Sequence, residues 1–142
     1  MQTVLFITDF LTLLKSLSMK SISLYLDFLK EKGKPLSEIN PGSDEIALTV
    51  RDALHALDLL KVSQIAILGG DVLSGESNEL IYAYQVWGEE YLYLNWYCDK
   101  AVNENKADYL QRSYLLAREG IIKANKTAEK LRKECYIVLV IE

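Results

Sequence analysis

The sequence predicts an α+β fold, in which a roughly four-stranded, mostly antiparallel sheet carries helices packed chiefly on one face. Three patterns indicate this fold. Apolar residues recur at helical spacing over 50–60 and 110–131, two apolar runs at 64–68 and 135–141 have the length of strands, and residues 79–98 are rich in aromatic and β-branched residues. With 142 residues, 50% of them hydrophobic and 25% charged, the chain has the composition of one globular domain.

Residues 1–18 allow two interpretations. Their leucines and phenylalanines recur at helical spacing, which predicts an amphipathic helix. Alternatively, the chain starts at Met19 and the residues before it are an extension of the start site. The segment lacks the basic start and the cleavage site of a signal peptide, and its apolar runs are too short to span a bilayer. We therefore expect no membrane partner, and one α+β domain over residues 19–142.

Two helices flank a loop in the next part of the chain. Residues 21–32 predict a helix that Gly33 ends. Residues 36–48 predict a loop, whose acidic residues do not match the spacing of a calcium site, so a solvated turn is the preferred interpretation. Thr49 predicts the start of the second helix, with Asp52 at the capping-box position.

The apolar run over 64–68 predicts a central strand that ends in a sharp bend at Gly69, Gly70 and Asp71. Paired glycines before an acid can also belong to a phosphate-binding loop. Neither a lysine nor the start of a helix follows them here, so a bend is the preferred interpretation.

Residues 79–98 predict a β-hairpin. The segments 79–87 and 90–98 flank Gly88 and Glu89, which suit a type II′ turn. The register set by this turn places aliphatic residues on one face and tyrosines on the other, because side chains alternate along a strand. The tyrosine face consists of Tyr82, Tyr84, Tyr91, Tyr93 and Tyr97. It either stabilises the sheet through cross-strand pairs or binds a partner.

Acidic residues surround the predicted hairpin. Residues 71–108 contain eight acidic residues against two lysines, whereas residues 109–134 contain seven basic residues against three acidic ones. Glu89, Glu90 and Asp99 lie next to the tyrosines in the sequence. An acidic, tyrosine-rich surface favours a basic protein partner, and the sequence pI of about 5.1 argues against nucleic-acid binding.

No catalytic constellation is expected. The single histidine, His55, is predicted to be half-exposed on a helix, and a nucleophile pair with Cys98 would lack a third, orienting group. Cys98 and Cys135 could be neighbours in one sheet, but buried free thiols are the preferred interpretation. We therefore expect a protein that is not an enzyme and that has neither a metal site nor a cofactor.

The last third of the chain predicts a long helix and a strand. Asn103 or Asn105 caps the helix, which runs to about Leu131, and Gly120 is a candidate position for a break or bend. The strand over 135–141 is apolar throughout, so we expect it to be central with both faces covered.

Three short motifs suggest a family. They are Gly69-Gly70-Asp71 after an apolar strand, Asn95-Trp96-Tyr97, and Arg112-Ser113-Tyr114 in the following helix, with an apolar strand at the end. Over residues 36–141 the chain resembles the immunity protein 40 family of bacterial polymorphic toxin systems. The resemblance implies a small cytoplasmic protein, encoded beside a toxin, that binds the cognate toxin domain and neutralises it. The positions that it marks are Gly69, Gly70, Asp71, Trp96, Tyr97, Arg112 and Tyr114, which either contact the toxin or hold the fold.

Two other functional classes stay open at this point. A small-molecule-binding or enzymatic domain would need a pocket with converging polar groups, for which Asp71, Asp99 and Arg112 are the candidates. A structural or oligomerisation module would bury the tyrosine face against a second copy, giving a homodimer.

Overall fold

The computed structural model describes residues 12–13 and 22–142. The predicted amphipathic helix over 1–18 lies outside the described residues except at positions 12 and 13, which are helical. Residues 22–32 form a helix, as predicted, and the Gly33 amide donates to the Leu29 carbonyl at its end (2.8 Å). The elements that follow are β1 (Lys34–Pro35), β2 (Ile46–Thr49), α2 (Val50–Val62), β3 (Ile67–Glu76), β4 (Glu79–Tyr82), α3 (Ala83–Trp87), the 3₁₀ helix η1 (Glu89–Leu94), β5 (Trp96–Tyr97), α4 (Lys106–Leu131) and β6 (Glu134–Ile141).

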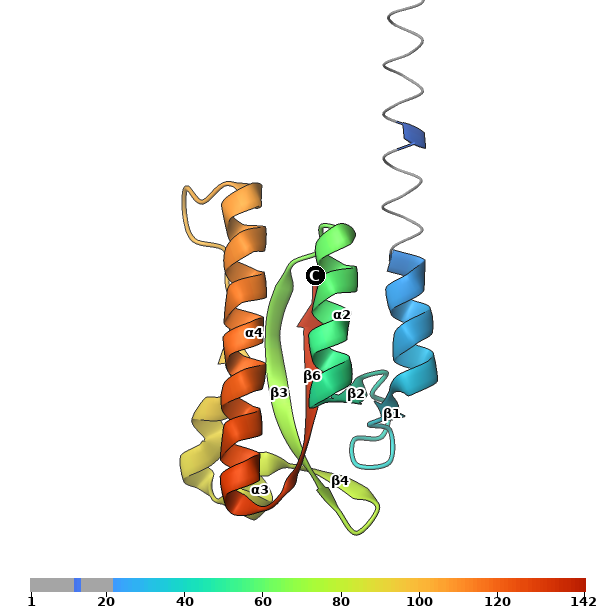
Figure 1. Ribbon diagram of the computed structural model, residues 1–142, viewed down its shortest axis with the longest axis vertical. Helices are drawn as coiled ribbons and strands as arrows, with labels where there is room; N and C mark the ends of the chain where they lie inside the picture. The colour runs from blue at the N-terminus through green and yellow to red at the C-terminus, as the bar shows by residue number, and fades with distance from the viewer. Residues whose placement is uncertain (1–11, 14–21) are drawn as a thin grey trace, which may run out of the picture.

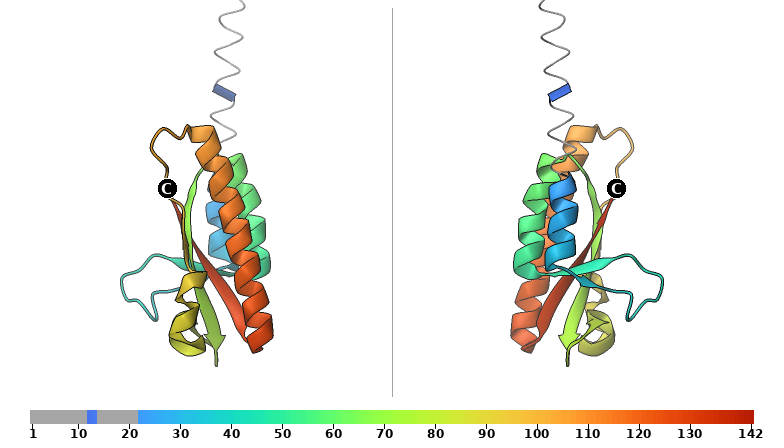
Figure 2. Two further views of the ribbon diagram at one scale, coloured as in Figure 1. Left: turned by 90° about the vertical axis from the view of Figure 1, so that its left-hand side faces the viewer. Right: turned by 90° about the vertical axis from the view of Figure 1, so that its right-hand side faces the viewer.

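The strands form one open sheet with the helices on one face. The strand order is β1-β2-β6-β3-β4, and β5 also pairs with β3. All of these pairs are antiparallel. Helices α2 and α4 and the helix over 22–32 lie on the same side of the sheet, while the loop over 36–45 projects from the other side (Figures 1 and 2). The predicted α+β class is confirmed, but the sheet has six strands and not four.

Both long helices begin as predicted. The Thr49 side chain accepts a hydrogen bond from the Asp52 amide at the start of α2 (3.2 Å), and the Asn105 side chain accepts one from the Asp108 amide at the start of α4 (2.9 Å). Such bonds satisfy backbone donors that have no partner within the helix. Helix α4 continues through Gly120 without a break.

The strand β2 was not predicted, because residues 46–48 were expected to belong to a loop. Its four residues are too few to show a period in the sequence. It forms because Ala47 and Leu48 pair with Val138 and Ile137 of β6 and are themselves buried. Pairing across the sheet therefore determines the structure of this segment.

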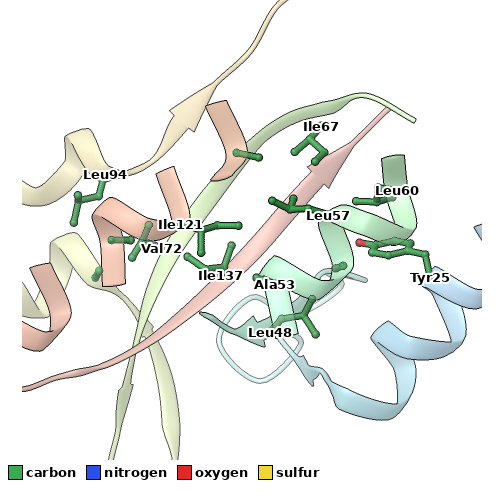
Figure 3. Close-up of a cluster of buried hydrophobic side chains, with 14 residues drawn as sticks. Tyr25, Leu48, Ala53, Leu57, Leu60, Ile67, Val72, Leu94, Ile121 and Ile137 are labelled. Carbon is green, nitrogen blue, oxygen red and sulfur yellow. The ribbon is translucent and has the colours of Figure 1, made fainter. Parts of the chain in front are cut away.

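The main core lies between the sheet and the helices (Figure 3). Leu57 of α2, Ile121 of α4 and Ile137 of β6 meet there, and all three are buried. A smaller apolar cluster lies on the opposite face, against the loop over 36–45. Its buried members are Leu36, Ala47, Leu73, Leu80 and Val138.

Strand β6 is central in the sheet, as predicted. It lies between β2 and β3, and its successive side chains Ile137 and Val138 enter the two clusters on opposite faces. Both faces of β6 are not covered along its whole length, because Val140, on the face without helices, is 37% exposed.

The predicted hairpin over 79–98 is wrong. Strand β4 instead turns back along β3 through Ser77 and Asn78, whose φ angles of 46° and 72° are those of a type I′ turn. The segment after β4 forms α3 and η1, and Gly88, with φ 126°, connects these two short helices.

The helical structure of this segment has a physical reason. Ala83, Trp87, Tyr91 and Leu94 recur at intervals of three or four residues, and all four pack against the main core. A hairpin would have placed them on both faces of a ribbon. Burial on the core side therefore outweighs the β propensity of the aromatic residues.

The predicted bend after residue 68 is also wrong. Strand β3 runs through Gly69, Gly70 and Asp71 and continues to Glu76. These three residues pair with Val140, Leu139 and Val138 of β6.

Candidate partner-binding face

The outer strand beside β3 is interrupted. Tyr82 at the end of β4 lies opposite Leu73, and Trp96 at the start of β5 lies opposite Gly70, on the same side of β3. Residues 83–95 are inserted between these two strands. The Val72 amide donates to the side-chain oxygen of Asn95 (2.8 Å), so a side chain replaces the missing strand partner.

Trp96 packs on the helix-covered face of the sheet between two glycines. A Cβ atom on Gly70 would overlap its indole ring, and a Cβ atom on Gly120 of α4 would lie 2.7 Å from the ring. A Cβ atom on Gly69 would overlap the Trp96 carbonyl oxygen. The glycines therefore allow a close approach of strand, indole ring and helix that no other residue permits.

Tyr97, the next residue, lies on the opposite face and is 80% exposed. We call this side of the sheet the helix-free face. Val140 lies on it across from Tyr97, because both pair with Gly69 of β3, which has no side chain to place between them. Asp71 follows on the same side of β3, two residues or about 7 Å further along.

Asp71 has an acidic neighbour. Partial burial raises the pKa of its carboxyl, and the negative charge of Glu45, at the end of the loop over 36–45, raises it further. Among the described residues no lysine or arginine forms an ion pair with either acid. The helix-free face thus has a negative region without a counter-charge of its own.

The loop over 98–105 leans toward the helix-free side at one end of the molecule (Figure 2). Arg112 of α4 holds it: Nε donates to Glu104 Oε2 (2.8 Å), and Nη2 donates to Glu104 Oε1 (2.7 Å) and to the Asp99 carbonyl (2.6 Å). Hydrogen bonds from Arg112 and from the Ala101 amide lower the pKa of Glu104 to about 2. The same pairing raises the pKa of Arg112.

The start of the same loop is fixed by two hydrogen bonds at the backbone of Cys98. The Tyr109 hydroxyl donates to the Cys98 carbonyl (2.8 Å), and the Cys98 amide donates to the Leu68 carbonyl (2.8 Å). Val102, in contrast, projects from the loop and is 91% exposed.

Tyr114 fixes the connection between α2 and β3. Its hydroxyl is shared between the carbonyl oxygens of Leu60 and Ile65, at 3.0 and 2.9 Å. Burial raises its pKa to about 12.

The predicted tyrosine face does not exist as one surface, because the hairpin that would create it is absent. Tyr82 and Tyr84 stack on each other with ring centroids 6.0 Å apart. Tyr91 and Tyr93 lie together on η1, where Lys123 of α4 stands over the Tyr93 ring. Tyr97 lies on β5, and among the described residues no ring contact joins it to either pair.

The three predicted acidic residues are likewise separated. Glu89 and Glu90 are exposed in the first turn of η1, and Asp99 is exposed in the loop over 98–105. In Figure 1 this loop and α3, which precedes η1, lie toward opposite ends of α4.

The candidate polar pocket of Asp71, Asp99 and Arg112 does not form. The Arg112 guanidinium contacts Glu104 and the Asp99 carbonyl, and no hydrogen bond or ion pair joins it to Asp71 in the described part of the chain.

The candidate nucleophile pair does not form either. His55 is exposed on α2 with its ring 4.9 Å from that of Phe28, whereas Cys98 is buried on the other side of the core beside Tyr109. Both cysteines are free, as predicted, and burial raises the pKa of the Cys135 thiol to about 12.

Comparison with known proteins adds one finding to this geometry. The family model named immunity protein 40 matches residues 35–141, which include the sheet except Lys34 of β1, together with α2, α4 and the loop over 98–105. The chain belongs to the immunity protein 40 family. No curated protein and no solved structure matches it. Among the described residues, no helix combines the length and the apolar composition needed to cross a bilayer.

Five of the seven marked positions make contacts within the fold. The close contact between strand and indole ring is formed by Gly69, Gly70 and Trp96. Arg112 holds the loop over 98–105, and Tyr114 holds the connection between α2 and β3. The other two, Asp71 and Tyr97, present their side chains on the helix-free face.

Several residues of the site were not predicted. Gly120 gave a signal, because a glycine inside a helix costs about 1 kcal/mol and often marks close packing. Asn95 belongs to one of the family motifs, but nothing in the sequence marks its contact with Val72 or the contact of Glu104 with Arg112, because both contacts form only when the chain has folded. The immunity protein therefore shows its binding candidates in the sequence, but not the contacts that position them.

Proposed function

We propose that this protein neutralises a cognate toxin domain by binding to it, without chemistry of its own. The match of the immunity protein 40 model to residues 35–141 carries the proposal. The toxin belongs to a bacterial polymorphic toxin system, and the protein acts in the cytoplasm of the cell that produces it.

The distribution of charge favours a basic toxin. Eight acidic residues and two lysines lie between 71 and 108, the part of the chain that contains β4, the insertion over 83–95 and the loop over 98–105. Surfaces of opposite charge attract each other over several ångströms before contact, which accelerates association.

The candidate interface residues are the ones named from the sequence, but they form separate groups on this acidic part of the molecule. They are Tyr82, Tyr84, Tyr91, Tyr93, Tyr97, Glu89, Glu90 and Asp99. Tyrosines combine a large contact area with little conformational freedom, and they are common at the centres of interfaces.

Growth and binding assays test the proposal. The toxin domain encoded beside this gene is expressed alone and together with the protein, and the two products are purified through a tag on one of them. We expect growth arrest by the toxin alone, rescue on co-expression and a co-purifying complex. A toxic neighbour that is neither bound nor neutralised would contradict the proposal.

A second experiment tests whether the acidic residues of the insertion accelerate association with the toxin. Glu89→Lys with Glu90→Lys should slow association and weaken its dependence on salt concentration. A control with the same charge change, Asp27→Lys with Glu31→Lys, lies on the helix over 22–32 and is exposed as well. Equal effects of the two variants would show that the insertion does not direct the approach of the toxin.

A further inference from the structure

The two most exposed large hydrophobic side chains of the described residues lie close together in the sequence. Val102 is 91% exposed and Tyr97 is 80% exposed. Contact with water is unfavourable for both side chains, so their exposure calls for a physical explanation.

Disorder does not explain the exposure, because close packing before Tyr97 and hydrogen bonds after Val102 hold the chain on both sides of these residues. Trp96 is fixed between two glycines directly before Tyr97. The Arg112–Glu104 pair, with its two short bonds, joins the loop over 98–105 to α4. The loop has a defined shape, and that shape holds Val102 away from the core.

A rigid exposed side chain is well suited to binding. Ordering a flexible side chain or loop on association costs free energy, and a chain segment that is already ordered avoids most of this cost. The Arg112–Glu104 pair lies at the edge of the core, since the Arg112 side chain is 38% exposed and the Glu104 side chain is 14% exposed. Its effect is to position the loop.

The charge next to these side chains specifies the chemistry of the partner. Asp71 and Glu45 lack a cationic partner among the described residues and lie on the same face as Tyr97. Gly69 leaves the space between Tyr97 and Val140 without a side chain. The surface therefore suits an apolar side chain with a lysine or arginine beside it.

We infer that the cognate toxin docks on the helix-free face at Tyr97 and Val140 and on the neighbouring loop that carries Val102, and that it directs a basic side chain toward Asp71 and Glu45. This inference rests on the proposed function. Tyr97 and Val102 are the anchors that determine how long the complex lasts, whereas Glu89 and Glu90, on the insertion, act on the rate of approach.

Arg112 is a positioning residue in this interface. It does not contact the toxin, but it holds the loop that presents Val102. Its replacement should weaken binding in the wild-type background and have little further effect once Val102 has been changed, because both changes act on the same contact.

The dissociation rate of the toxin complex tests the inference. Tyr97→Ala and Val102→Asp should each raise the dissociation rate about tenfold or more, as expected for central interface residues, and change the association rate much less. The matched control is Val62→Asp at the end of α2, because Val62 is also an exposed valine (64%) and lies outside the proposed patch.

The outcomes separate this inference from the proposed function. If the wild-type protein does not bind the toxin, the proposed function itself is wrong. If the wild-type protein binds and both anchor variants dissociate like Val62→Asp, the toxin docks elsewhere and the inference is overturned. Circular dichroism and urea unfolding of each variant establish that it is folded.

Affinity measurements on two pairs of variants test whether Arg112 acts by positioning the loop. Arg112→Gln is compared with wild type, and Arg112→Gln with Val102→Asp is compared with Val102→Asp alone. An equal fold-change in affinity in the two comparisons would show that Arg112 acts on general stability and not through the loop.

Discussion

The two faces of β5 differ in how closely their side chains are packed. Trp96 enters the space between Gly70 and Gly120 on the helix-covered face, and Tyr97, one residue later, is 80% exposed on the helix-free face. Successive side chains of a strand point in opposite directions, so one residue of β5 is closely packed and the next lies at the surface.

This contrast separates stability from binding. Changes on the helix-covered face act on the free energy of unfolding, because they disturb packing that cannot relax. Changes at Tyr97, which is exposed on the helix-free face outside the buried cluster of Leu73 and Val138, should leave folding almost unaffected and alter what the surface can bind. The following variants test each half of the comparison.

The largest effect is expected for Trp96→Ala. It removes the indole ring between β3 and α4 and leaves a cavity, which should lower the free energy of unfolding by about 3 kcal/mol. Urea unfolding followed by circular dichroism measures the change. A loss below about 1 kcal/mol would show that the ring is not part of the packed structure.

Gly120→Ala tests the same contact from the helix. In the wild-type protein the new methyl group meets the ring, so we expect a net loss of about 1 kcal/mol despite the better helix propensity of alanine. In the Trp96→Ala background the ring is gone, and the same change should stabilise the protein by about 1 kcal/mol. The reversal of sign is the decisive observation; two changes of the same sign would contradict the contact.

Tyr114→Phe removes one hydroxyl on the helix-covered side. The hydrogen bond to the carbonyl oxygens of Leu60 and Ile65 is lost, which should lower the free energy of unfolding by about 1 kcal/mol. Tyr93→Phe is the matched control, since Tyr93 is 58% exposed. Thermal unfolding of both variants should show a lower midpoint for Tyr114→Phe only.

The acid dependence of stability tests the loop over 98–105. The Glu104 carboxyl has a folded-state pKa of about 2, below its ordinary value of 4.5, so its contribution is present above pH 4.5 and is lost as the pH falls toward 2. Glu104→Gln should therefore flatten the decline of the unfolding midpoint in this range. Asp71→Asn should steepen it, because the pKa of Asp71 is shifted in the opposite direction.

The smallest effect on stability is expected for Tyr97→Ala. Its side chain is mostly in water, so the free energy of unfolding should change by less than about 0.5 kcal/mol. A loss comparable to that of Trp96→Ala would end the distinction between the two faces.

The parts of the fold that could be predicted are those with a strong local signal. Thr49 and Asn105 cap helices whose apolar residues keep a helical period, and the strand over 135–141 is apolar throughout. The segment over 83–94 gave two conflicting signals: its aromatic residues favour a strand, while the spacing of Trp87, Tyr91 and Leu94 favours a helix. Only the position of the core decides between them.

The residue types of the candidate site could be proposed from the sequence, but their arrangement could not. An acidic surface with tyrosines was expected, and Tyr97 and Asp71 were marked by the family motifs. The loop that carries Val102 depends on Arg112 and Glu104, which are eight residues apart and meet only when α4 is formed. Contacts of this kind have no signature in a single sequence.

The Asn95 side chain has a consequence for the motions of the sheet. Strand β3 has β6 on one side and β4 and β5 on the other, and Asn95 supplies the acceptor where the outer strand is missing. Without it, the Val72 amide would face the gap and exchange its hydrogen with solvent early. With it, β3 is hydrogen-bonded across that gap, so we expect local opening to start at the ends of the sheet and hydrogen exchange in its middle to require unfolding of the whole protein.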